Sequence, residues 1–191
     1  MTTNRLEAFS DGVMAIIITI FVLEMEVPEG ADLESLNHVL PTFLTYVLSF
    51  VYIGIYWNNH HHLWQAVERV SGKVLWANLH LLFWLSLLPF ATGWMGQNHF
   101  AEIPVALYGV VLLMASVAWY ILGQKVVKNE GTESKVGKAY QKDRKTKLSM
   151  LIYTTAVAIA FFQPIVSCAI YILLAAAWFI PDRRIEKALE N

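Results

Sequence analysis

The positions of the basic residues constrain this chain more than any other feature of its sequence. Lys and Arg are absent from three long stretches, which run from Arg5 to Arg69, from Lys73 to Lys125 and from Lys147 to Arg183. The apolar runs lie in these gaps, and of all 191 residues 57% are hydrophobic and 15% charged. A soluble domain has about a quarter of its residues charged. The pattern therefore predicts an all-α integral membrane protein with several spans.

Six segments are candidates for spanning the bilayer. A spanning helix needs about 20 apolar residues, because each residue adds about 1.5 Å and the hydrocarbon core is about 30 Å thick. The expected spans are residues 8–27, 39–62, 74–96, 104–125, 148–163 and 165–181. The last two are separated at Gln163-Pro164, because proline interrupts helices and one helix over the whole run would be too long. We expect a single six-helix domain over residues 1–191.

The charges also predict how the spans are oriented. With both termini in the cytoplasm, every Lys and Arg falls on the inner side, as the positive-inside rule requires. The outer side then receives only acids: Glu24, Glu26, Glu29, Asp32, Glu34 and Glu102. Residues 126–147 form the one sizeable polar segment, which we expect to be a solvated cytoplasmic loop. A contact with anionic lipid head groups is the alternative for this loop.

Composition and spacing exclude several classes of function. A net charge of −1 gives no reason to expect a nucleic-acid partner. The single cysteine, Cys168, cannot form an internal disulfide and is expected to be a small packing residue. Consecutive His60-His61-His62 point to different helical faces, so we expect no metal site. The chain shows no nucleophile–base pair and no haem-attachment motif, so we expect neither an enzyme nor a cofactor.

An acid near the start of the first span needs a partner or water. Asp11 lies about one turn inside the span, where an unpaired carboxylate is costly. Arg5 lies on another helical face and Glu7 has the same sign, so we expect the partner on another helix. The topology brings four polar side chains to the same depth: His60, His61, Asn78 and His80. We expect a buried network between Asp11 and these residues, with Arg5 reaching in from the interface; a proton relay is the alternative.

The start of the first span also resembles a known signature. Arg5-x-x-x-Phe9-Ser10-Asp11 is similar to the RxxxFSD motif of the transmembrane protein 175 family, the endolysosomal potassium channels and their bacterial relatives. The resemblance continues through FSDGVMAI, through Trp57 with His60-His61, and through LLFWLSLLPF with its Pro89. Six spans in 191 residues match the bacterial single-repeat form.

The resemblance implies a function and an assembly. Members are potassium-permeable channels that lack the TVGYG filter, and this chain also has no TVGYG. In the single-repeat form four subunits assemble, and the first helix of each lines a central pore. The narrowest ring would be Ile16, with Thr19 and Leu23 further along and K⁺ passing close to Ile16 and Thr19. The implied partners are further copies of the chain, membrane lipid and monovalent cations, in the cell membrane of a bacterium or archaeon.

The helical phase agrees with this assignment. At about 100° per residue, Gly12, Ile16, Thr19 and Leu23 fall on one face of the first helix. Periodicity alone does not select that face, because the helix is apolar all round. Ordinary packing residues, with Thr19 bonded to its own i−4 carbonyl, are the alternative. Beyond the helix, Glu24 and Glu26 would form an acidic outer mouth that concentrates cations. In this assignment Asp11 and Ser10 anchor the pore helix to its neighbours.

Two other functions compete with a channel. A proton-coupled transporter, or a proton leak, would use Asp11 and the inner histidines, although the chain has no inverted repeat. A membrane enzyme or haem protein would use His60 to His62 and His80. A cation channel agrees best with the residues and with the resemblance.

Overall fold

The computed structural model describes residues 2–140 and 143–179. Within these residues the chain forms α-helices and no β-strand. The helices are α1 (Thr3–Leu23), α2 (Leu33–Gln65), α3 (Gly72–Ser86), α4 (Leu88–Gln97), α5 (Glu102–Glu130), α6 (Lys135–Tyr140), α7 (Arg144–Ala160) and α8 (Pro164–Phe179).

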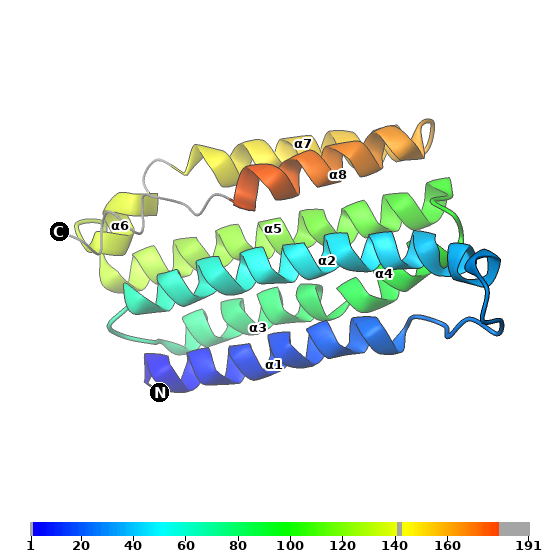
Figure 1. Ribbon diagram of the computed structural model, residues 1–191. Coiled ribbons are helices and arrows are strands. Elements are labelled where there is room, and N and C mark those ends of the chain that lie inside the picture. The colour runs from blue at the N-terminus through cyan, green and yellow to red at the C-terminus, as the bar shows by residue number, and fades with distance from the viewer. Residues whose placement is uncertain (1, 141–142, 180–191) are drawn as a thin grey trace.

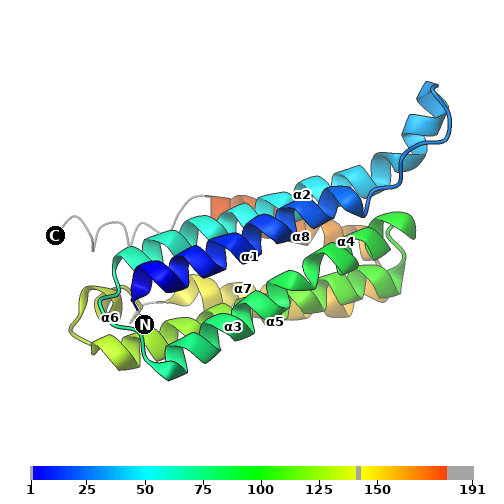
Figure 2. The ribbon, with the colours of Figure 1, turned by 90° about the horizontal axis from the view of Figure 1, so that it is seen from below.

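The long helices form two layers that run side by side (Figures 1 and 2). One layer holds α1, α2 and α8, and the other holds α3 with α4, α5 and α7. Contacts between the layers join α1 to α3, α2 to α4, and α7 to α8, and α5 packs on both α3 and α7. The short α6 lies at the end of the bundle where the N-terminus also lies (Figure 1). The pairing leaves α1 at one edge, where much of its surface is uncovered.

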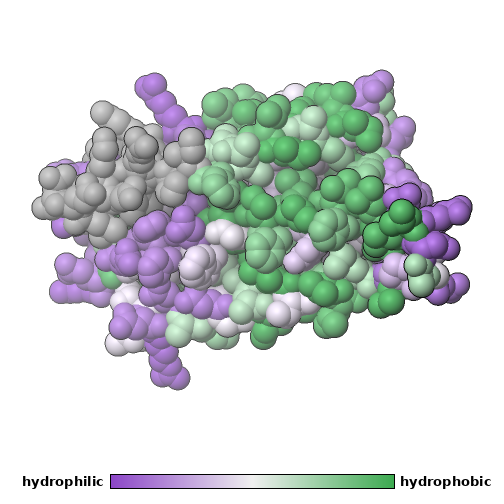
Figure 3. Space-filling view, viewed as in Figure 1, coloured by the Kyte–Doolittle hydropathy of each residue, from purple (hydrophilic) through white to green (hydrophobic). Residues whose placement is uncertain are grey.

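Helix length and surface composition both fit a bilayer. Among the described residues, four helical stretches are long and apolar enough to cross a membrane: Thr3–Leu23, Leu33–Gln65, Gly72–Gln97 and Glu102–Glu130. The shorter α8 is also apolar. On the face drawn in Figure 3, hydrophobic residues form a broad band and hydrophilic residues gather at both ends. The chain is therefore a multi-pass membrane protein.

The first two helices differ from the expected spans at their ends. The first span was expected at 8–27, but α1 begins at Thr3 and ends at Leu23. Pro28 follows soon after and disfavours helix in the residue before it. The second was expected at 39–62, but α2 runs from Leu33 to Gln65. A carboxylate oxygen of Asp32 accepts the backbone N–H of Ser35 at 2.8 Å, and this cap starts α2 outside the apolar run.

The third span is interrupted. The expected helix at 74–96 is divided into α3 and α4, with the break at Leu87. Pro89 explains the break, because its ring removes a backbone N–H and clashes with the carbonyl of Leu85. The interruption turns α4 away from the axis of α3 without ending the crossing (Figure 1).

The expected polar loop at 126–147 is largely helical. The fourth helix, expected at 104–125, continues to Glu130 and ends at Gly131, whose φ of 94° is a conformation that favours glycine. Residues 135–140 then form α6, which packs Tyr140 against Gly123 of α5. The next helix begins at Arg144 rather than 148, because Asp143 accepts the N–H of Thr146 and caps it.

The last two helices form the expected hairpin. Helix α7 ends at Ala160 rather than 163, and α8 begins at Pro164 rather than 165. Gln163 lies in the turn as the sequence predicts, whereas Pro164 is the first residue of α8. The described part of α8 ends at Phe179, and residues 180 and 181 of the expected span lie outside the described residues.

One contact fixes the link between α2 and α3. The Glu130 carboxylate, at the end of α5, accepts the backbone N–H groups of Glu68 at 3.3 Å and Arg69 at 3.0 Å. The side-chain amide of Asn129 donates to the carbonyl of Arg69 at 2.8 Å. This link positions the inner ends of α2 and α3, which carry His60 and Asn78.

Candidate functional site

Helix α1 has one packed face and one uncovered face. The packed side chains recur every three or four residues: Leu6, Ser10, Met14, Ile17 and Phe21. The opposite face carries the residues predicted to line a pore, and Gly12, Ile16, Thr19 and Leu23 are all exposed. Ile16 is 60% exposed and Leu23 is 81% exposed, although both lie on an apolar spanning helix. None of the described residues covers this face, so it is open to lipid or to another subunit.

The hydroxyl of Thr19 uses its proton within its own helix. Thr19 Oγ1 donates to the carbonyl of Ile16 at 2.8 Å, which is the i−3 carbonyl rather than the i−4 one of the alternative packing assignment. The oxygen lone pairs therefore stay available on the exposed side of the helix, where they can accept from water or contact a cation. Gly12 is open as well, because a Cβ added there would meet no described atom within 4 Å. Packing within the subunit therefore gives no reason for glycine at this position.

A buried hydrogen-bond chain joins α1, α2 and α3 at the end of the bundle where α1 begins. Ser10 Oγ donates to the carbonyl of Leu6 at 2.9 Å and accepts from Asn78 Nδ2 at 2.9 Å. Asn78 Oδ1 lies 2.8 Å from His60 Nε2, which makes that nitrogen the donor. Ser10, Asn78 and His60 are each almost fully buried. Three helices are thereby held in one register by the Ser10–Asn78–His60 chain.

The expected network around Asp11 is wrong in its pairing. The hydrogen bond recorded for Asp11 comes from Trp57 Nε1 at 3.1 Å, so its partner is on another helix but is not a histidine. His61 Nδ1 instead lies 2.6 Å from a carboxylate oxygen of Glu7. Adjacent residues on a helix are rotated by about 100°, so when Ser10 faces the bundle interior Asp11 must face its edge. Glu7 shares that edge one turn nearer the N-terminus, where it meets His61.

Two further residues of the predicted network lie apart from it. His80 Nε2 accepts from Trp84 Nε1 at 3.0 Å, and both are on α3. Arg5 is exposed on the same face as Ile16, and no ion pair is recorded for it within the described part of the chain. Phe9 is half-exposed beside it on that face. The signature residues therefore divide between two roles: Ser10 belongs to the core, whereas Arg5 and Phe9 belong to the uncovered face.

The outer end of α1 is acidic and open. Glu24 and Glu26 are exposed, and Glu26 lines an open cavity of about 560 Å³ together with Glu29, His38 and His99. In the adjoining loop, the N–H of Ser35 lowers the pKa of the Asp32 carboxyl, so this acid keeps its charge in mildly acidic solution. Among the described residues, no group of three or more His, Cys, Asp or Glu side chains could hold a metal ion.

Comparisons with known proteins identify the family. The sequence profile described as "Endosomal/lysosomal potassium channel TMEM175" matches residues 5–89. A potassium channel of Chryseobacterium sp. (strain P1-3) is 54% identical over 191 residues, which is 100% of both chains. The chain belongs to the TMEM175 family. The TMEM175 profile matches the segment that contains every candidate residue of the α1 face. The same segment contains the hydrogen-bonded residues around Ser10, His60 and Asn78.

Other TMEM175 relatives agree in fold and differ in length. The crystal structure of a lysosomal potassium-selective channel TMEM175 homologue from Chamaesiphon minutus superposes with a TM-score of 0.82 at 26% identity, covering 94% of this chain and 97% of that one. The endosomal/lysosomal proton channel TMEM175 of Danio rerio is 24% identical over 195 residues, covering 94% of this chain but 36% of that protein. These relatives are channels, which points away from an enzyme.

Sequence reasoning missed several hydrogen-bond partners of the histidines in this TMEM175 chain. Trp64 Nε1 donates to His60 Nδ1 at 3.0 Å, the ring nitrogen that is left as an acceptor when Nε2 donates to Asn78. Gln65 Nε2 lies 2.8 Å from His61 Nε2. Both pairs, like His80 with Trp84, are four residues apart on one helix. The i, i+4 spacing was therefore a readable signal. Glu7 was set aside for its like charge with Asp11, although its i−4 position puts both acids on the edge that faces α2.

Proposed function

We propose that this chain is one subunit of a potassium-permeable channel in which four copies arrange α1 around a central axis. The observation that carries the proposal is the uncovered face of α1. Its apolar side chains are exposed along a spanning helix, and the hydrogen bond of the Thr19 hydroxyl, to the carbonyl of Ile16, lies within α1 itself. The name of the Chryseobacterium relative supports potassium as the permeant ion.

The chemistry of this face suits a pore with two successive rings of side chains. A ring of Ile16 side chains excludes water when it is narrow, so it can close the pore by dewetting. A ring of Thr19 hydroxyls, whose protons are held by the Ile16 carbonyls, presents oxygen lone pairs that replace part of the hydration of a cation. Because the chain has no TVGYG segment, selection among cations would depend on these side chains.

The proposed topology has six spans with both termini in the cytoplasm of a bacterial or archaeal cell. In this topology α1, α3–α4 and α7 run outward, whereas α2, α5 and α8 run inward. The location of every Lys and Arg supports it, because all of them then lie on the inner side. Glu24 and Glu26 would lie at the outer mouth, where they attract cations and repel anions.

The test is planar-bilayer recording of the purified protein, with potassium on one side and sodium on the other. We expect unitary currents that reverse toward the potassium equilibrium potential. Ile16→Asn should raise the current, because the polar amide keeps the constriction wet. The matched control is Ile172→Asn on α8, where the isoleucine is 54% exposed but lies away from α1. Equal effects of the two substitutions would contradict a pore along α1.

A proton pathway is the second candidate function. The observation that favours it is the name of the animal relatives, which are proton channels. In this chain the carboxylates at the inner end of α1 are Asp11, bonded to Trp57, and Glu7, bonded to His61. Proton flux into vesicles with a pH-sensitive dye tests this candidate. Proton flux abolished by Asp11→Asn, with potassium current unchanged, would establish a proton route that uses Asp11; equal loss of both would indicate damage to the pore helix.

A further inference from the structure

The buried face of α2 is polar along most of its length. Its buried side chains include Thr42, Thr45, Ser49, Tyr52 and Asn59. Hydroxyl and amide groups inside a membrane protein need partners, because the bilayer supplies no water to replace a missing hydrogen bond. The exposed side chains of α2 are mostly large and apolar, so the helix is more polar inside than outside.

Most of these groups are satisfied by the protein. Thr45 Oγ1 donates to the carbonyl of Thr42 at 2.8 Å. Ser49 Oγ lies 2.7 Å from Thr92 Oγ1 and 3.0 Å from the hydroxyl of Tyr108. The Tyr52 hydroxyl donates to the carbonyl of Tyr171 at 2.6 Å. These bonds join α2 to α4, α5 and α8 through the middle of the bundle.

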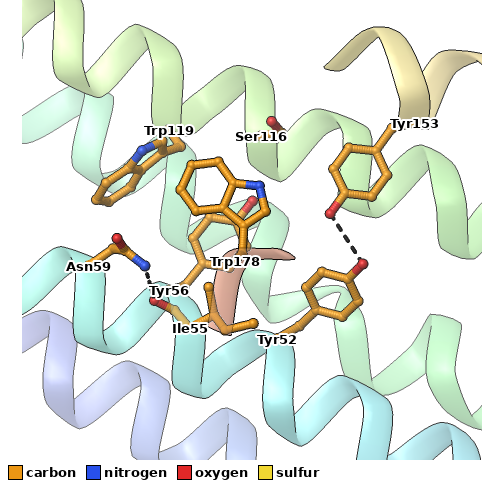
Figure 4. A pocket seen from close by; sticks show the side chains of 8 residues that line it. All are labelled: Tyr52, Ile55, Tyr56, Asn59, Ser116, Trp119, Tyr153 and Trp178. Atoms are coloured by element: carbon orange, nitrogen blue, oxygen red, sulfur yellow. Dashed lines mark hydrogen bonds between the residues drawn. The ribbon is translucent and has the colours of Figure 1, made fainter. Parts of the chain in front are cut away.

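Several groups without a partner line one small cavity, which Figure 4 shows. The cavity lies between α2, α5, α7 and α8 and has a volume of about 30 Å³. Ser116 is 4% exposed and Asn59 is 5% exposed, and both line it. Asn59 Nδ2 donates to the carbonyl of Ile55 at 2.8 Å, but its Oδ1 has no partner among the described residues. The Ser116 and Tyr56 hydroxyls, which also line the cavity, likewise have none within the part of the chain described.

The size and chemistry of the cavity select its occupant. A volume of about 30 Å³ holds a water molecule, and a bound water needs two to four polar partners. The polar groups that line the cavity are neutral hydroxyls, one amide and two indole N–H groups, so an unpaired cation would be very unfavourable there. An apolar chain would leave all of these groups unsatisfied.

We propose that this cavity is a binding site for one ordered water molecule. The water bridges Asn59 and Tyr56 on α2 to Ser116 on α5. The Tyr153 hydroxyl on α7, which donates its proton to Tyr52 at 3.2 Å, can still accept a hydrogen bond at this site. The site lies apart from the uncovered face of α1, so it does not depend on the proposed pore. Its effect is to hold the α5–α7 pair against α2.

Trp178 closes the cavity from the side of α8. Its indole lies in front of Tyr56 in Figure 4, and its Nε1 donates to Ser149 Oγ on α7 at 2.8 Å. The ammonium nitrogen of Lys145 lies 4.4 Å from the centre of the indole ring. These two contacts hold the indole in place, and the closed side separates the water from lipid chains.

The test combines a high-resolution structure of the full-length protein with melting measurements in one detergent. We expect a compact density peak within hydrogen-bonding distance of Ser116 Oγ and the Tyr56 hydroxyl. Ser116→Ala and Tyr56→Phe should each lower the melting temperature by about 2–4 °C. The double variant should lose less than the sum, because both groups hold the same water. The matched control is Thr155→Val, which removes an exposed hydroxyl bonded within α7 and should change the melting temperature by less than about 1 °C.

Three results would overturn the site. The first is an empty cavity in a map that shows other buried waters. The second is an elongated density that continues into detergent or lipid. The third is a set of strictly additive or neutral effects on the melting temperature. If Tyr56→Phe fails to fold, Ser116→Val replaces it, because the valine methyl group enters the cavity and should remove the density peak while the fold remains.

Discussion

At the scale of single residues, the exposed and buried hydroxyl groups of α1 have different roles. Thr19 holds its proton within the helix and presents its oxygen to the uncovered face. Ser10, on the opposite face, is fully buried and bonded at both its donor and its acceptor positions. The Thr19 oxygen thus stays available on the exposed face, whereas the Ser10 hydroxyl is committed to the fold.

Thr19→Val is expected to weaken potassium selectivity. Valine keeps the shape of threonine but removes the oxygen, so a dehydrating cation loses one ligand per subunit. We expect the permeability ratio of potassium to sodium to fall about two- to fivefold, from reversal potentials under bi-ionic conditions. Thr19→Ser should retain most of the selectivity. Thr155→Val, an exposed position on α7, is the matched control, and an equal change in that variant would remove Thr19 from the pore.

Asn78→Ala is expected to destabilise the inner end of the bundle. The substitution leaves both Ser10 and the ring of His60 without their shared partner. We expect a loss of about 1–3 kcal/mol in unfolding free energy, measured by titration with a denaturing detergent. Asn98→Ala is the control, because Asn98 is exposed and bonds only within its own turn at Trp94. Losses of equal size would mean that the Ser10–Asn78–His60 chain contributes nothing specific.

At the scale of elements, helix ends and helix crossings follow different physics. The start of α2 is set by the Asp32 cap, which lies outside the apolar run and is fully solvated. The crossing of α5 with α8 is set by close contact, because Gly109 leaves room for the hydroxyl end of Tyr171. Neither feature can be recognised in a hydropathy profile, yet both determine where the spanning helices lie.

Asp32→Ala is expected to loosen the first turn of α2. The folded pKa of Asp32 is below its unfolded value of about 3.9, so the cap contributes fully above that pH and is lost as pH falls through the folded pKa. Amide hydrogen exchange at Ser35 should therefore be equally protected at pH 7 and pH 5 after correction for intrinsic rates. In the alanine variant exchange should be several-fold faster at both. Unchanged exchange would mean that neighbouring contacts, not the cap, hold the turn.

Gly109→Ala is expected to separate α5 from α8. A Cβ at this position would collide with the hydroxyl of Tyr171 and with Val157, so the neighbours must shift. We expect a destabilisation of about 1–3 kcal/mol, seen as a lower melting temperature. Gly54→Ala on α2 is the matched control, because a Cβ there meets no described atom within 4 Å, and it should be neutral or stabilising. Similar melting for both variants would contradict this close packing.

At the scale of the whole molecule, the subunit is closed on most sides and open along α1. The two layers bury their polar groups against one another, whereas the face that carries Gly12, Ile16, Thr19 and Leu23 remains exposed. A hydrophobic exposed face is expected against lipid, and the proposed assembly, with other copies of α1 around an axis, would also account for the glycine and threonine on it.

Cysteine cross-linking tests this assembly. In a Cys168→Ser background, Leu23→Cys places one thiol on the α1 face, where the native side chain is 81% exposed. We expect a short bismaleimide to yield covalent dimers in membranes, because copies meet around the axis. Leu173→Cys on α8 is the control, where the native leucine is 69% exposed and should face lipid. Dimers from position 173 but not from position 23 would reverse the proposed assembly.

The sequence by itself determined that this chain is a helical membrane protein of the TMEM175 family, and it determined which face of α1 carries Ile16 and Thr19. Hydrophobic length, charge position and helical phase are local properties, so they can be read along the chain. Only the tertiary structure decided that Asn78 pairs with Ser10 rather than Asp11, that Glu7 meets His61, and that residues 126–140 are mostly helical. A pairing depends on the rotation and depth of two helices together, and one residue of rotation turns a side chain by about 100°, which no single helix specifies.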